Sequence, residues 1–491
     1  MARRGAGALA LLLGLGIGPH GGRSSPSNKE SMCPGSNTSD PGHAALFNCS
    51  SFGPADGFYP LPKSARHPVM FVPSMIGSYL ERKLHNSDPV YPICANGGWM
   101  GGSSWYRMWP PAGLNLAASR GSGITGALAC LLDMSCLPTD LFPLYADCWG
   151  DDLTTVFDKA TGLSHPKPGV QIRANGSLGI VADNSSAIPE YLCASKVLQA
   201  AGYQAYAEYD SLGYDWRLAP ADWSAPGGYY EGLKTKIEGL RQRNGKPVVL
   251  VSLSLGGPVT AVFLNRYVDQ AWKDQNIYNW LSTSGTFGGV QESLLQQITF
   301  NGSTTVSMPS HDDSPGRQLM TPEYSLKTFQ GWPSQNWMAA TLAPNDVVVN
   351  VTGSSVEYRG KDIGNLFDVI KNPNHLKEQA VKNALSPSTT APGVETYIFT
   401  GSGHGTPRTF EFAATADGRP NLGLDSPAPK PHCVDGDGVA TASSLSGVPQ
   451  RWAAQGLQRG KKVEITILAN VSHGGDIAQP QVLRKLYEII Q

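Results

Sequence analysis

Three polar side chains, widely separated in the 491-residue sequence, have the types that covalent acyl chemistry requires. A serine hydroxyl is a weak nucleophile, and it needs a neighbouring base that is itself oriented by a carboxylate. Ser254, Asp437 and His473 could fill these roles, because each follows a strand-like run of residues. Taken singly, each would also suit an ordinary turn or surface position. Asp437 could belong to a calcium loop, but the glutamate of an EF-hand is missing.

The stretch around Ser254 has the order strand, tight turn and helix. Val248 to Val251 is a short aliphatic run, typical of a strand buried on both faces of a parallel sheet. A helix is predicted beyond Pro258, since proline is tolerated in a helix's first turn. Gly256 supplies the second glycine of a G-x-S-x-G nucleophile elbow, whereas Ser252 replaces the first. This stretch alone would equally suit a buried strand and its turn.

A second strand-to-helix turn is predicted near the start of the folded region. Pro68 to Val72 reads as a buried strand, and Tyr79 to Leu84 as a helix. Backbone N–H groups at such a turn can stabilise a developing oxyanion. Met75 in this turn, and Leu255 after the candidate nucleophile, could therefore form an oxyanion hole. The alternative is an ordinary connection between a strand and a helix.

The remaining elements alternate between helix and strand, which predicts a mostly parallel sheet with crossover helices. Serine, aspartate and histidine also follow the chain order of α/β-hydrolases, so we expect an α/β fold of that kind. The alternation is lost between about residues 290 and 390, where an inserted cap or lid is predicted. The predicted helices are Glu190–Ala201 and Tyr229–Asn244, and the predicted strands are Tyr203–Tyr206, Trp280–Gly285, Val394–Thr400 and Lys462–Leu468.

The N-terminus and the composition indicate the secretory route. Residues 1–24 read as a signal peptide, and residues 25–65 as a loosely ordered lead-in tied by Cys33 and Cys49. Eight cysteines and seven Asn-x-Ser/Thr triplets suit an oxidising lumen, so we expect a secreted, lysosomal or vacuolar glycoprotein. No later apolar run of about 20 residues is present, which predicts a soluble or peripheral protein. The candidate glycosylation sites are Asn175, Asn184, Asn301, Asn350 and Asn470.

Charge and cysteine spacing exclude several kinds of partner. A net charge of −1 with no basic face gives no reason to expect nucleic acid. No cysteine pair has the CxxC spacing of a zinc site. We therefore expect neither a metal nor a cofactor, and we expect a monomer.

Residues 94 to 148 differ in character from their surroundings. Trp99, Trp105 and Trp109 lie among glycines and prolines, and cysteines bracket the segment. Indole rings favour the boundary between water and lipid, so these residues could contact a membrane surface. They could equally pack a small subdomain.

Several motifs recur in one order along about residues 66 to 490. They are Pro68–Leu84, Asp147-Cys148-Trp149 with Asp151, Tyr214-Asp215-Trp216-Arg217, the Ser254 turn, the Gly-Gly after Phe287, Asp435-Gly436-Asp437-Gly438 and His473. Together they resemble the motifs of the lecithin:cholesterol acyltransferase family, and the similarity looks greatest to its lysosomal phospholipase A branch. The resemblance implies an α/β-hydrolase domain over residues 66–491, with a membrane-binding insertion at 94–148 and a cap and lid at 286–390.

The resemblance also implies individual roles. Ser254, Asp437 and His473 would form a catalytic triad, with the amides of Met75 and Leu255 as the oxyanion hole. A disulfide between Cys94 and Cys148 would close the membrane-binding insertion.

The sequence departs from the family pattern at several positions. Ser252-Leu253 replaces a small residue and a histidine, and Pro73-Ser74-Met75 replaces a Pro-Gly pair and its follower. Tyr397 stands where a second family disulfide would need a cysteine. Cys130 and Cys136 are candidates to pair with each other.

These observations favour a serine lipid acyl hydrolase or O-acyltransferase that cleaves a glycerophospholipid acyl ester through an acyl-serine intermediate. The acyl group would pass to water or to a lipid alcohol at a phospholipid membrane surface. One alternative is a general carboxylesterase, which would show no preference for lipid interfaces. Another is a non-catalytic lipid-binding glycoprotein, which would have no need of the three residues in this order.

Overall fold

The structure is a computed structural model. It describes residues 33, 49, 52–75, 77–85, 104–109, 142–174, 191–299, 322–370, 376–383, 390–422 and 426–491. The predicted signal peptide and most of the lead-in lie outside these residues. So do Cys94, Trp99, Cys130, Cys136, Asn175, Asn184 and Asn301.

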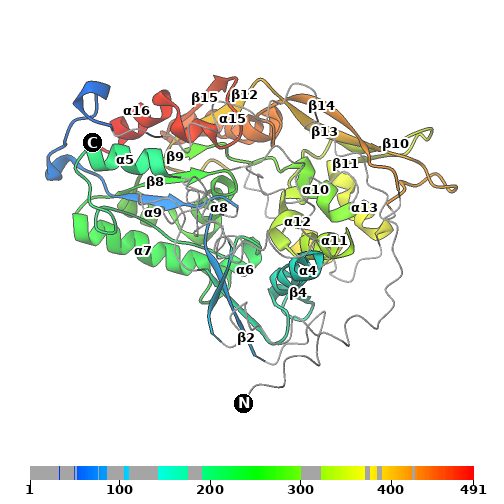
Figure 1. Ribbon diagram of the computed structural model, residues 1–491. Coiled ribbons are helices and arrows are strands. Elements are labelled where there is room, and N and C mark those ends of the chain that lie inside the picture. The colour runs from blue at the N-terminus through cyan, green and yellow to red at the C-terminus, as the bar shows by residue number, and fades with distance from the viewer. Residues whose placement is uncertain are drawn as a thin grey trace, which may run out of the picture.

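A six-stranded sheet forms the centre of the described chain (Figure 1). Its strands lie in the order β15–β12–β9–β8–β1–β7, and all neighbouring strands are parallel. The predicted mostly parallel sheet is therefore confirmed, and the fold is that of an α/β-hydrolase. The strands are β1 (Val69–Val72), β7 (Tyr209–Ser211), β8 (Val248–Leu253), β9 (Ile277–Thr283), β12 (Glu395–Ser402) and β15 (Val463–Ala469).

Helices cover both faces of this sheet, which explains the continuous apolar runs in β1 and β8. Val69 and Phe71 of β1 pack with α5 (Leu192–Ala200) and α16 (Pro480–Ile489) on one face. Met70 and Val72 pack with α7 (Tyr229–Asn244), α8 (Gly256–Val262) and α15 (Ala442–Arg459) on the other. Successive side chains of a strand point to opposite faces, so a strand covered on both sides needs apolar residues throughout.

A second group of elements lies to one side of the central sheet (Figure 1). It has its own hydrophobic core, to which residues from α10, α12 and β10 contribute. Its sheet has the order β11–β10–β13–β14, so part of it comes from residues beyond the predicted cap at 286–390. The elements are α10 (Gln291–Ile298), α11 (Pro322–Gln330), α12 (Pro333–Ala340), α13 (Ile363–Val369), α14 (Leu376–Asn383), β10 (Val347–Val351), β11 (Glu357–Arg359), β13 (His404–Phe412) and β14 (Lys430–Gly436).

Smaller elements surround the start of the central sheet. A three-stranded sheet has the order β3–β2–β6, and β4 pairs with β5. These elements are β2 (Leu80–Leu84), β3 (Tyr106–Trp109), β4 (Thr155–Asp158), β5 (Leu163–Pro166), β6 (Val170–Ala174), α4 (Phe142–Leu153), α6 (Pro220–Ser224) and α9 (Gln270–Asn276).

The predicted helix at Tyr79–Leu84 is wrong, because these residues form strand β2. Leu80, Arg82 and Leu84 are buried while the residues between them are partly exposed, which is the alternation of a strand. Leucines four residues apart also fit a helix, so the local pattern was ambiguous. The pairing with β3 and β6 decides the outcome.

The predicted strand at Tyr203–Tyr206 is also wrong. Tyr206 has a φ of 63°, in the left-handed region, and its N–H donates to the Tyr209 carbonyl at 2.7 Å. The chain therefore turns here, and the strand that pairs with β1 begins at Tyr209.

Hydrogen bonds of Arg217 and an ion pair of Asp151 connect the Tyr-Asp-Trp-Arg segment, α4 and the second group of elements. Arg217 is fully buried, its Nε donates to Asp215 at 2.8 Å, and its Nη1 donates to the Leu153 carbonyl at 2.8 Å. The Arg217 carbonyl accepts from the Ser334 N–H of α12 at 2.9 Å. At the other side of α4, Asp151 pairs with Lys327 of α11 at 2.9 Å. The Tyr-Asp-Trp-Arg motif thus fixes α12 against the body of the fold.

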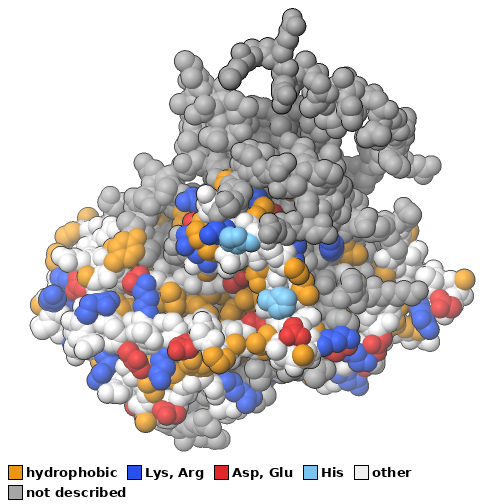
Figure 2. Space-filling view, turned by 90° about the horizontal axis from the view of Figure 1, so that it is seen from below, with side chains coloured by type: hydrophobic (Ala, Val, Ile, Leu, Met, Phe, Trp, Pro, Cys, Tyr) orange, Lys and Arg blue, Asp and Glu red, His pale blue; other side chains and the backbone are white. Residues whose placement is uncertain are grey.

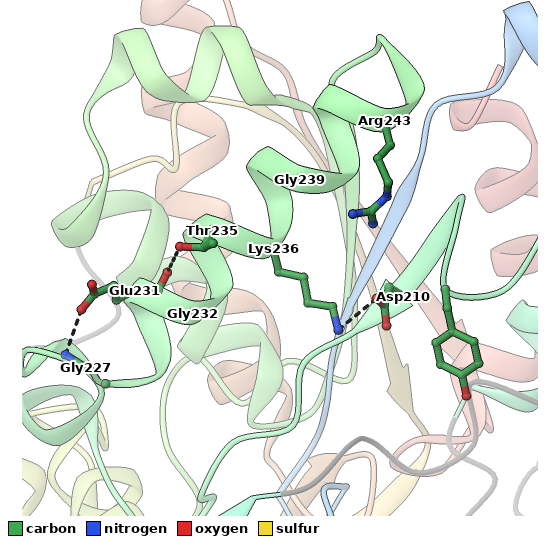
Figure 3. Close-up of a pocket in the computed structure, with 10 residues that line it drawn as sticks. Asp210, Gly227, Glu231, Gly232, Thr235, Lys236, Gly239 and Arg243 are labelled. Atoms are coloured by element: carbon green, nitrogen blue, oxygen red, sulfur yellow. Dashed lines mark hydrogen bonds and ion pairs between the residues drawn. The ribbon is translucent and has the colours of Figure 1, made fainter.

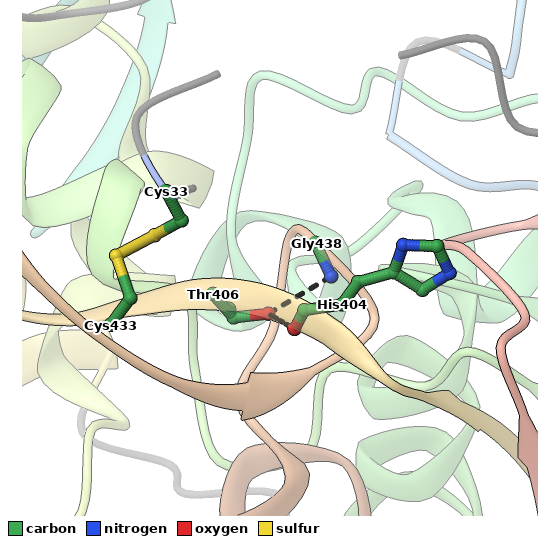
Figure 4. The surroundings of a disulfide bond; sticks show 5 residues. All are labelled: Cys33, His404, Thr406, Cys433 and Gly438. Atoms are coloured by element: carbon green, nitrogen blue, oxygen red, sulfur yellow. Dashed lines mark hydrogen bonds between the residues drawn. A yellow bond between two sulfur atoms is a disulfide. The ribbon is translucent and has the colours of Figure 1, made fainter. Parts of the chain in front are cut away.

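Disulfides attach the lead-in to the folded domain. Cys33 is bonded to Cys433, and Cys49 is bonded to Cys193. The sequence left the partners of these two cysteines open, and each bond reaches a distant part of the chain. Figure 4 shows Cys433 on β14, next to strand β13, whose Thr406 hydroxyl accepts from the Gly438 N–H at 2.9 Å. The Cys33–Cys433 bond therefore lies close to the loop that carries Asp437.

Two further observations concern membranes. Within the ranges given above, no helix is long and apolar enough to cross a bilayer. Seen from below, hydrophobic side chains gather along the middle of the described surface, with charged side chains around them (Figure 2).

The double substitution Cys33→Ser/Cys433→Ser should lower the free energy of unfolding by about 2–5 kcal/mol, because it frees a closed loop in the unfolded chain. Thermal unfolding under non-reducing conditions measures this effect. Equal melting temperatures for the variant and the wild type would contradict the assigned bond, and a reductant should remove any difference between them.

Candidate active site

Ser254 lies in a strained turn between β8 and α8. Its φ is 54°, which is in the left-handed region that non-glycine residues rarely adopt. The Ser254 N–H donates to the Thr283 carbonyl of β9 at 3.0 Å, and its carbonyl accepts from the Gly257 N–H at 2.9 Å. Strain of this kind costs roughly 1–3 kcal/mol and persists only where the surroundings enforce it. The turn lifts the hydroxyl above the strand ends.

The residues on either side of Ser254 show how closely the turn is packed. A Cβ on Gly256 would lie 2.4 Å from the Val72 carbonyl oxygen and 2.7 Å from that of Pro73. Only glycine fits here, which confirms the reason for the second glycine of the motif. Ser252, at the first glycine position, is fully buried, and its hydroxyl accepts from Trp280 Nε1 at 2.9 Å. The buried hydroxyl that Ser252 adds at this glycine position thus has a hydrogen-bond donor in Trp280 of β9.

The three side chains selected from the sequence meet in one hydrogen-bonded chain. His473 Nε2 lies 2.8 Å from Ser254 Oγ, and His473 Nδ1 lies 2.7 Å from Asp437 Oδ2. The other oxygen of Asp437 accepts from the N–H groups of Val439 at 3.0 Å and Ala440 at 2.8 Å. Asp437 is buried and fully engaged, so it can hold the imidazole in one orientation.

The charges around His473 favour its protonated form. Burial lowers the pKa of His473, but the charge of Asp437, its hydrogen bond and the charge of Asp476 together raise that pKa above the ordinary value. A base with a raised pKa accepts a proton from a serine more readily, although it is also protonated more readily in acid.

Asp437 reaches the site from the four-stranded sheet β11–β10–β13–β14. It follows β14, and the hairpin of β13 and β14 brings the chain back to the end of β12. A Cβ on Gly401, in β12, would lie 3.2 Å from Asp437 Cβ and 1.9 Å from the carbonyl oxygen of Val471. The absence of a side chain at Gly401 thus allows the aspartate loop and the histidine loop to approach the same strand.

Met75 and Leu255 lie on neighbouring turns. Met75 follows β1, while Leu255 is the N-cap residue of α8. Hydroxyl groups hold the first turn in place, because Tyr191 donates to the Val72 carbonyl at 2.6 Å and Tyr214 to the Pro73 carbonyl at 2.9 Å. The arrangement is compatible with an oxyanion hole, which stays a prediction.

A second carboxylate, which was not predicted from the sequence, lies behind the histidine. Asp476 lies in the short 3-10 helix η7 (Gly475–Ala478), is fully buried, and its Oδ2 accepts from the Ser284 N–H at 2.6 Å. The Ser284 hydroxyl in turn accepts from the Gly474 N–H at 2.9 Å. The spacing His-Gly-Gly-Asp at residues 473 to 476 was the available signal.

The other predicted site residues are dispersed. Trp105 is exposed, with the Arg173 guanidinium 4.1 Å from its ring centroid, and Trp109 ends β3. Cys148 is disulfide-bonded, but its predicted partner Cys94 lies outside the described residues. Asn350 is half-buried in β10, and Asn470 is exposed.

A surface pocket beside α7 does not belong to this site. Figure 3 shows it lined by Asp210, Glu231, Lys236 and Arg243 together with glycines of α7. None of the three hydrogen-bonded residues lines it. Among the residues that the structure describes, no group of three or more histidine, cysteine, aspartate or glutamate side chains is placed to hold a metal ion.

Comparisons with known proteins agree with this geometry. Residues 137–311 match the family model described as "Lecithin:cholesterol acyltransferase". Human "Lysosomal phospholipase A and acyltransferase" is 26% identical, over 78% of this chain and 82% of its own length. Human "Phosphatidylcholine-sterol acyltransferase" is 28% identical, over 70% of this chain and 69% of its own length.

Among solved structures, a hormone-sensitive lipase from a metagenome library covers 77% of this chain and 96% of its own. It is 12% identical with a TM-score of 0.28, so the fold assignment depends on the strand order and not on this likeness.

The strand order and the hydrogen-bonded serine, histidine and aspartate define an α/β-hydrolase with the side-chain arrangement of a serine hydrolase. The sequence matches are more specific than this class. The chain is similar to the lecithin:cholesterol acyltransferase family over residues 137–311, and to the two human relatives at 26% and 28% identity.

Gly256→Ala should lower the free energy of unfolding by about 1–3 kcal/mol, because the new methyl group would meet two backbone carbonyls that cannot turn away. Chemical denaturation measures the change. Gly447→Ala is the matched control, since a Cβ at this position in α15 meets nothing within 4 Å and should stabilise the helix by about 1 kcal/mol. Equal stability of the Gly256 variant and the wild type would contradict the close packing of the turn.

Proposed function

We propose that this protein is a serine lipid acyl hydrolase and O-acyltransferase acting on glycerophospholipids. The hydrogen-bonded chain from Ser254 through His473 to Asp437 carries the proposal, because it has the parts and distances that acyl transfer to a serine requires. The names of the relatives, which combine phospholipase and acyltransferase activities, support the lipid substrate.

In the first step, Ser254 Oγ attacks the carbonyl carbon of an acyl ester while His473 Nε2 takes the hydroxyl proton. Asp437 stabilises the imidazolium that forms and holds its tautomer. The tetrahedral intermediate then collapses, the C–O bond to the glycerol oxygen breaks, and His473 returns the proton to that oxygen. The products are a lysophospholipid and an acyl ester on Ser254.

In the second step, the acceptor hydroxyl takes the place of the serine. His473 removes its proton, the acceptor oxygen attacks the acyl-serine carbonyl, and Ser254 leaves with the proton. Water as the acceptor gives a fatty acid, whereas a lipid alcohol gives a new ester. The amides of Met75 and Leu255 would stabilise the oxyanion in both steps.

The lipid surface is the proposed partner outside the active site. The exposed Trp105, with the neighbouring tryptophans of the 94–148 insertion, would lie at the boundary between water and lipid. Residues 286–390 would act as the cap and lid of the hydrolase domain. The protein would bind the membrane peripherally, as a monomer.

The proposed compartment is an oxidising lumen. Disulfides join residues 400 and 144 positions apart, and bonds of this kind persist outside the reducing cytosol. A signal peptide at residues 1–24 would direct the chain there. The lysosomal form has the support of one relative's name, and a secreted or vacuolar form would need the same oxidising lumen.

Ser254→Ala should reduce release of fatty acid from phospholipid vesicles by at least about 10³-fold, because it removes the hydroxyl that lies 2.8 Å from His473 Nε2 and would form the acyl intermediate. Product analysis, with and without a sterol, a diacylglycerol or a ceramide in the vesicle, measures hydrolysis and transfer separately. Ser224→Ala, at an exposed position at the end of α6, is the matched control and should keep wild-type activity. Full activity of Ser254→Ala would refute the nucleophile.

The same assays separate the two alternatives. A general carboxylesterase would hydrolyse a soluble p-nitrophenyl ester as well as it hydrolyses vesicles, and Trp105→Ala would leave both rates equal. A non-catalytic lipid carrier would not react with a fluorophosphonate. We expect labelling of the wild type and none of Ser254→Ala.

A further inference from the structure

Asp476 is a buried carboxylate that the proposed reaction does not use. It has no exposed surface, and its Oδ1 accepts from its neighbour's N–H, that of Ile477, at 3.0 Å. Its Oδ2 accepts from the N–H of Ser284, which also donates to the Phe399 carbonyl at 3.0 Å. Burying a carboxylate costs free energy of folding unless hydrogen bonds or nearby charges compensate it. A buried aspartate is therefore a candidate for a role in the site.

The hydrogen bonds of Asp476 lead directly to the candidate base. Ser284 follows β9 and has a φ of 46°, so its backbone is strained in the same sense as that of Ser254. Its hydroxyl accepts from Gly474, the residue next to His473. One residue before Ser284, the Thr283 carbonyl accepts from the Ser254 N–H. The end of β9 therefore contacts the nucleophile turn on one side and the histidine loop on the other.

We propose that Asp476 is a positioning residue for His473, which it holds against the nucleophile turn through Ser284 while adding a second negative charge behind the imidazole. The inference rests on the proposed function, because it assigns a role to a residue around the same base. Asp476 touches neither Ser254 nor a substrate. It acts only through His473 and the loop that carries it.

The charge on Asp476 acts on a small and defined set of groups. Its pKa is raised to about 7 by burial, and His473 and Asp437 are the charged groups that act on it. The elements packed against η7 are α5, α16 and β12. Their charged side chains are engaged elsewhere or exposed: Lys196 donates to the Cys49 carbonyl, Lys485 pairs with Glu488, Glu395 accepts from the Lys462 N–H, and Arg484 is exposed.

The charges on Asp476 and His473 determine in which direction the pH dependence of activity should move. His473 must be neutral to accept the serine proton, so activity falls as pH drops through the pKa of His473. A negative charge on Asp476 raises that pKa. Removing this charge lowers the pKa of His473, and the acidic limb of the rate profile should then move to lower pH.

The rate of fluorophosphonate labelling as a function of pH tests this inference on the full-length glycoprotein. The reagent reports only on Ser254 and its base, so no lipid substrate has to be assumed. Asp476→Asn keeps an oxygen to accept from Ser284 but removes the charge. Its half-maximal rate should occur at lower pH than in the wild type, by at most about one pH unit because Asp476, with a pKa of about 7, is only partly charged over the acidic limb. Its plateau rate should stay within about tenfold. Asp476→Ala loses the acceptor as well, and its plateau rate should fall by more than tenfold.

Asp222→Asn is the matched control. Asp222 is half-buried, burial raises the pKa of its carboxyl to about 6, and it accepts from the Ser164 and Ala219 N–H groups in a different part of the fold. We expect no movement of its acidic limb. A limb that moves as far in Asp222→Asn as in Asp476→Asn would overturn the proposal.

An unchanged limb in a folded Asp476→Asn variant would also overturn it, because a merely structural aspartate would lower the melting temperature and leave the pH profile in place. If that variant does not fold, Ser284→Gly tests the link, since glycine accepts the left-handed conformation and only the hydroxyl is lost. Its plateau rate should fall several-fold, and an unchanged plateau would refute the link. Failure of the proposed function is separate, because then the wild type itself would show no labelling that depends on Ser254.

Discussion

The close contact between the start of α8 and the end of β1 is the constraint on which the rest of the site depends. Gly256 lies against the Val72 and Pro73 carbonyls, and two residues before it Ser254 has a left-handed backbone with a φ of 54°. The strain presents the hydroxyl at a single point above the sheet. The loops that carry His473 and Asp437 need only reach that point, and they do so from chain segments about 180 to 220 residues further on.

Much of this arrangement could be predicted from the sequence because it is encoded locally. Val248 to Val251 and Gly256 follow directly from burial on both sheet faces and from a turn too tight for a side chain. The parallel sheet follows from the alternation of helices and strands. Chain order alone selected His473 among ten histidines, since only that residue follows the Asp437 loop within the last part of the chain.

The features of the fold and of the site that were not predicted depend on contacts between residues far apart in the sequence. Local sequence patterns carry no information about such contacts. Leu80 to Leu84 became a strand because β3 and β6 pair with it. Asp437 belongs to a hairpin of the smaller sheet, so its approach to β12 is a matter of tertiary packing. Asp476 was missed for a related reason, because its partner Ser284 is 192 residues away. Cysteine pairing likewise has no local signature.

The bond between Cys33 and Cys433 also restricts the order in which the protein can be made. Residue 33 is synthesised early, whereas residue 433 follows only after 400 more residues. Cys33 therefore cannot form its native bond until nearly the whole polypeptide has been synthesised. Cys433 precedes Asp437 by four residues, so the disulfide is formed in the segment that leads into the aspartate loop. Formation of the Cys33–Cys433 bond, and with it the covalent attachment of the segment before Asp437, is therefore a late step of biosynthesis.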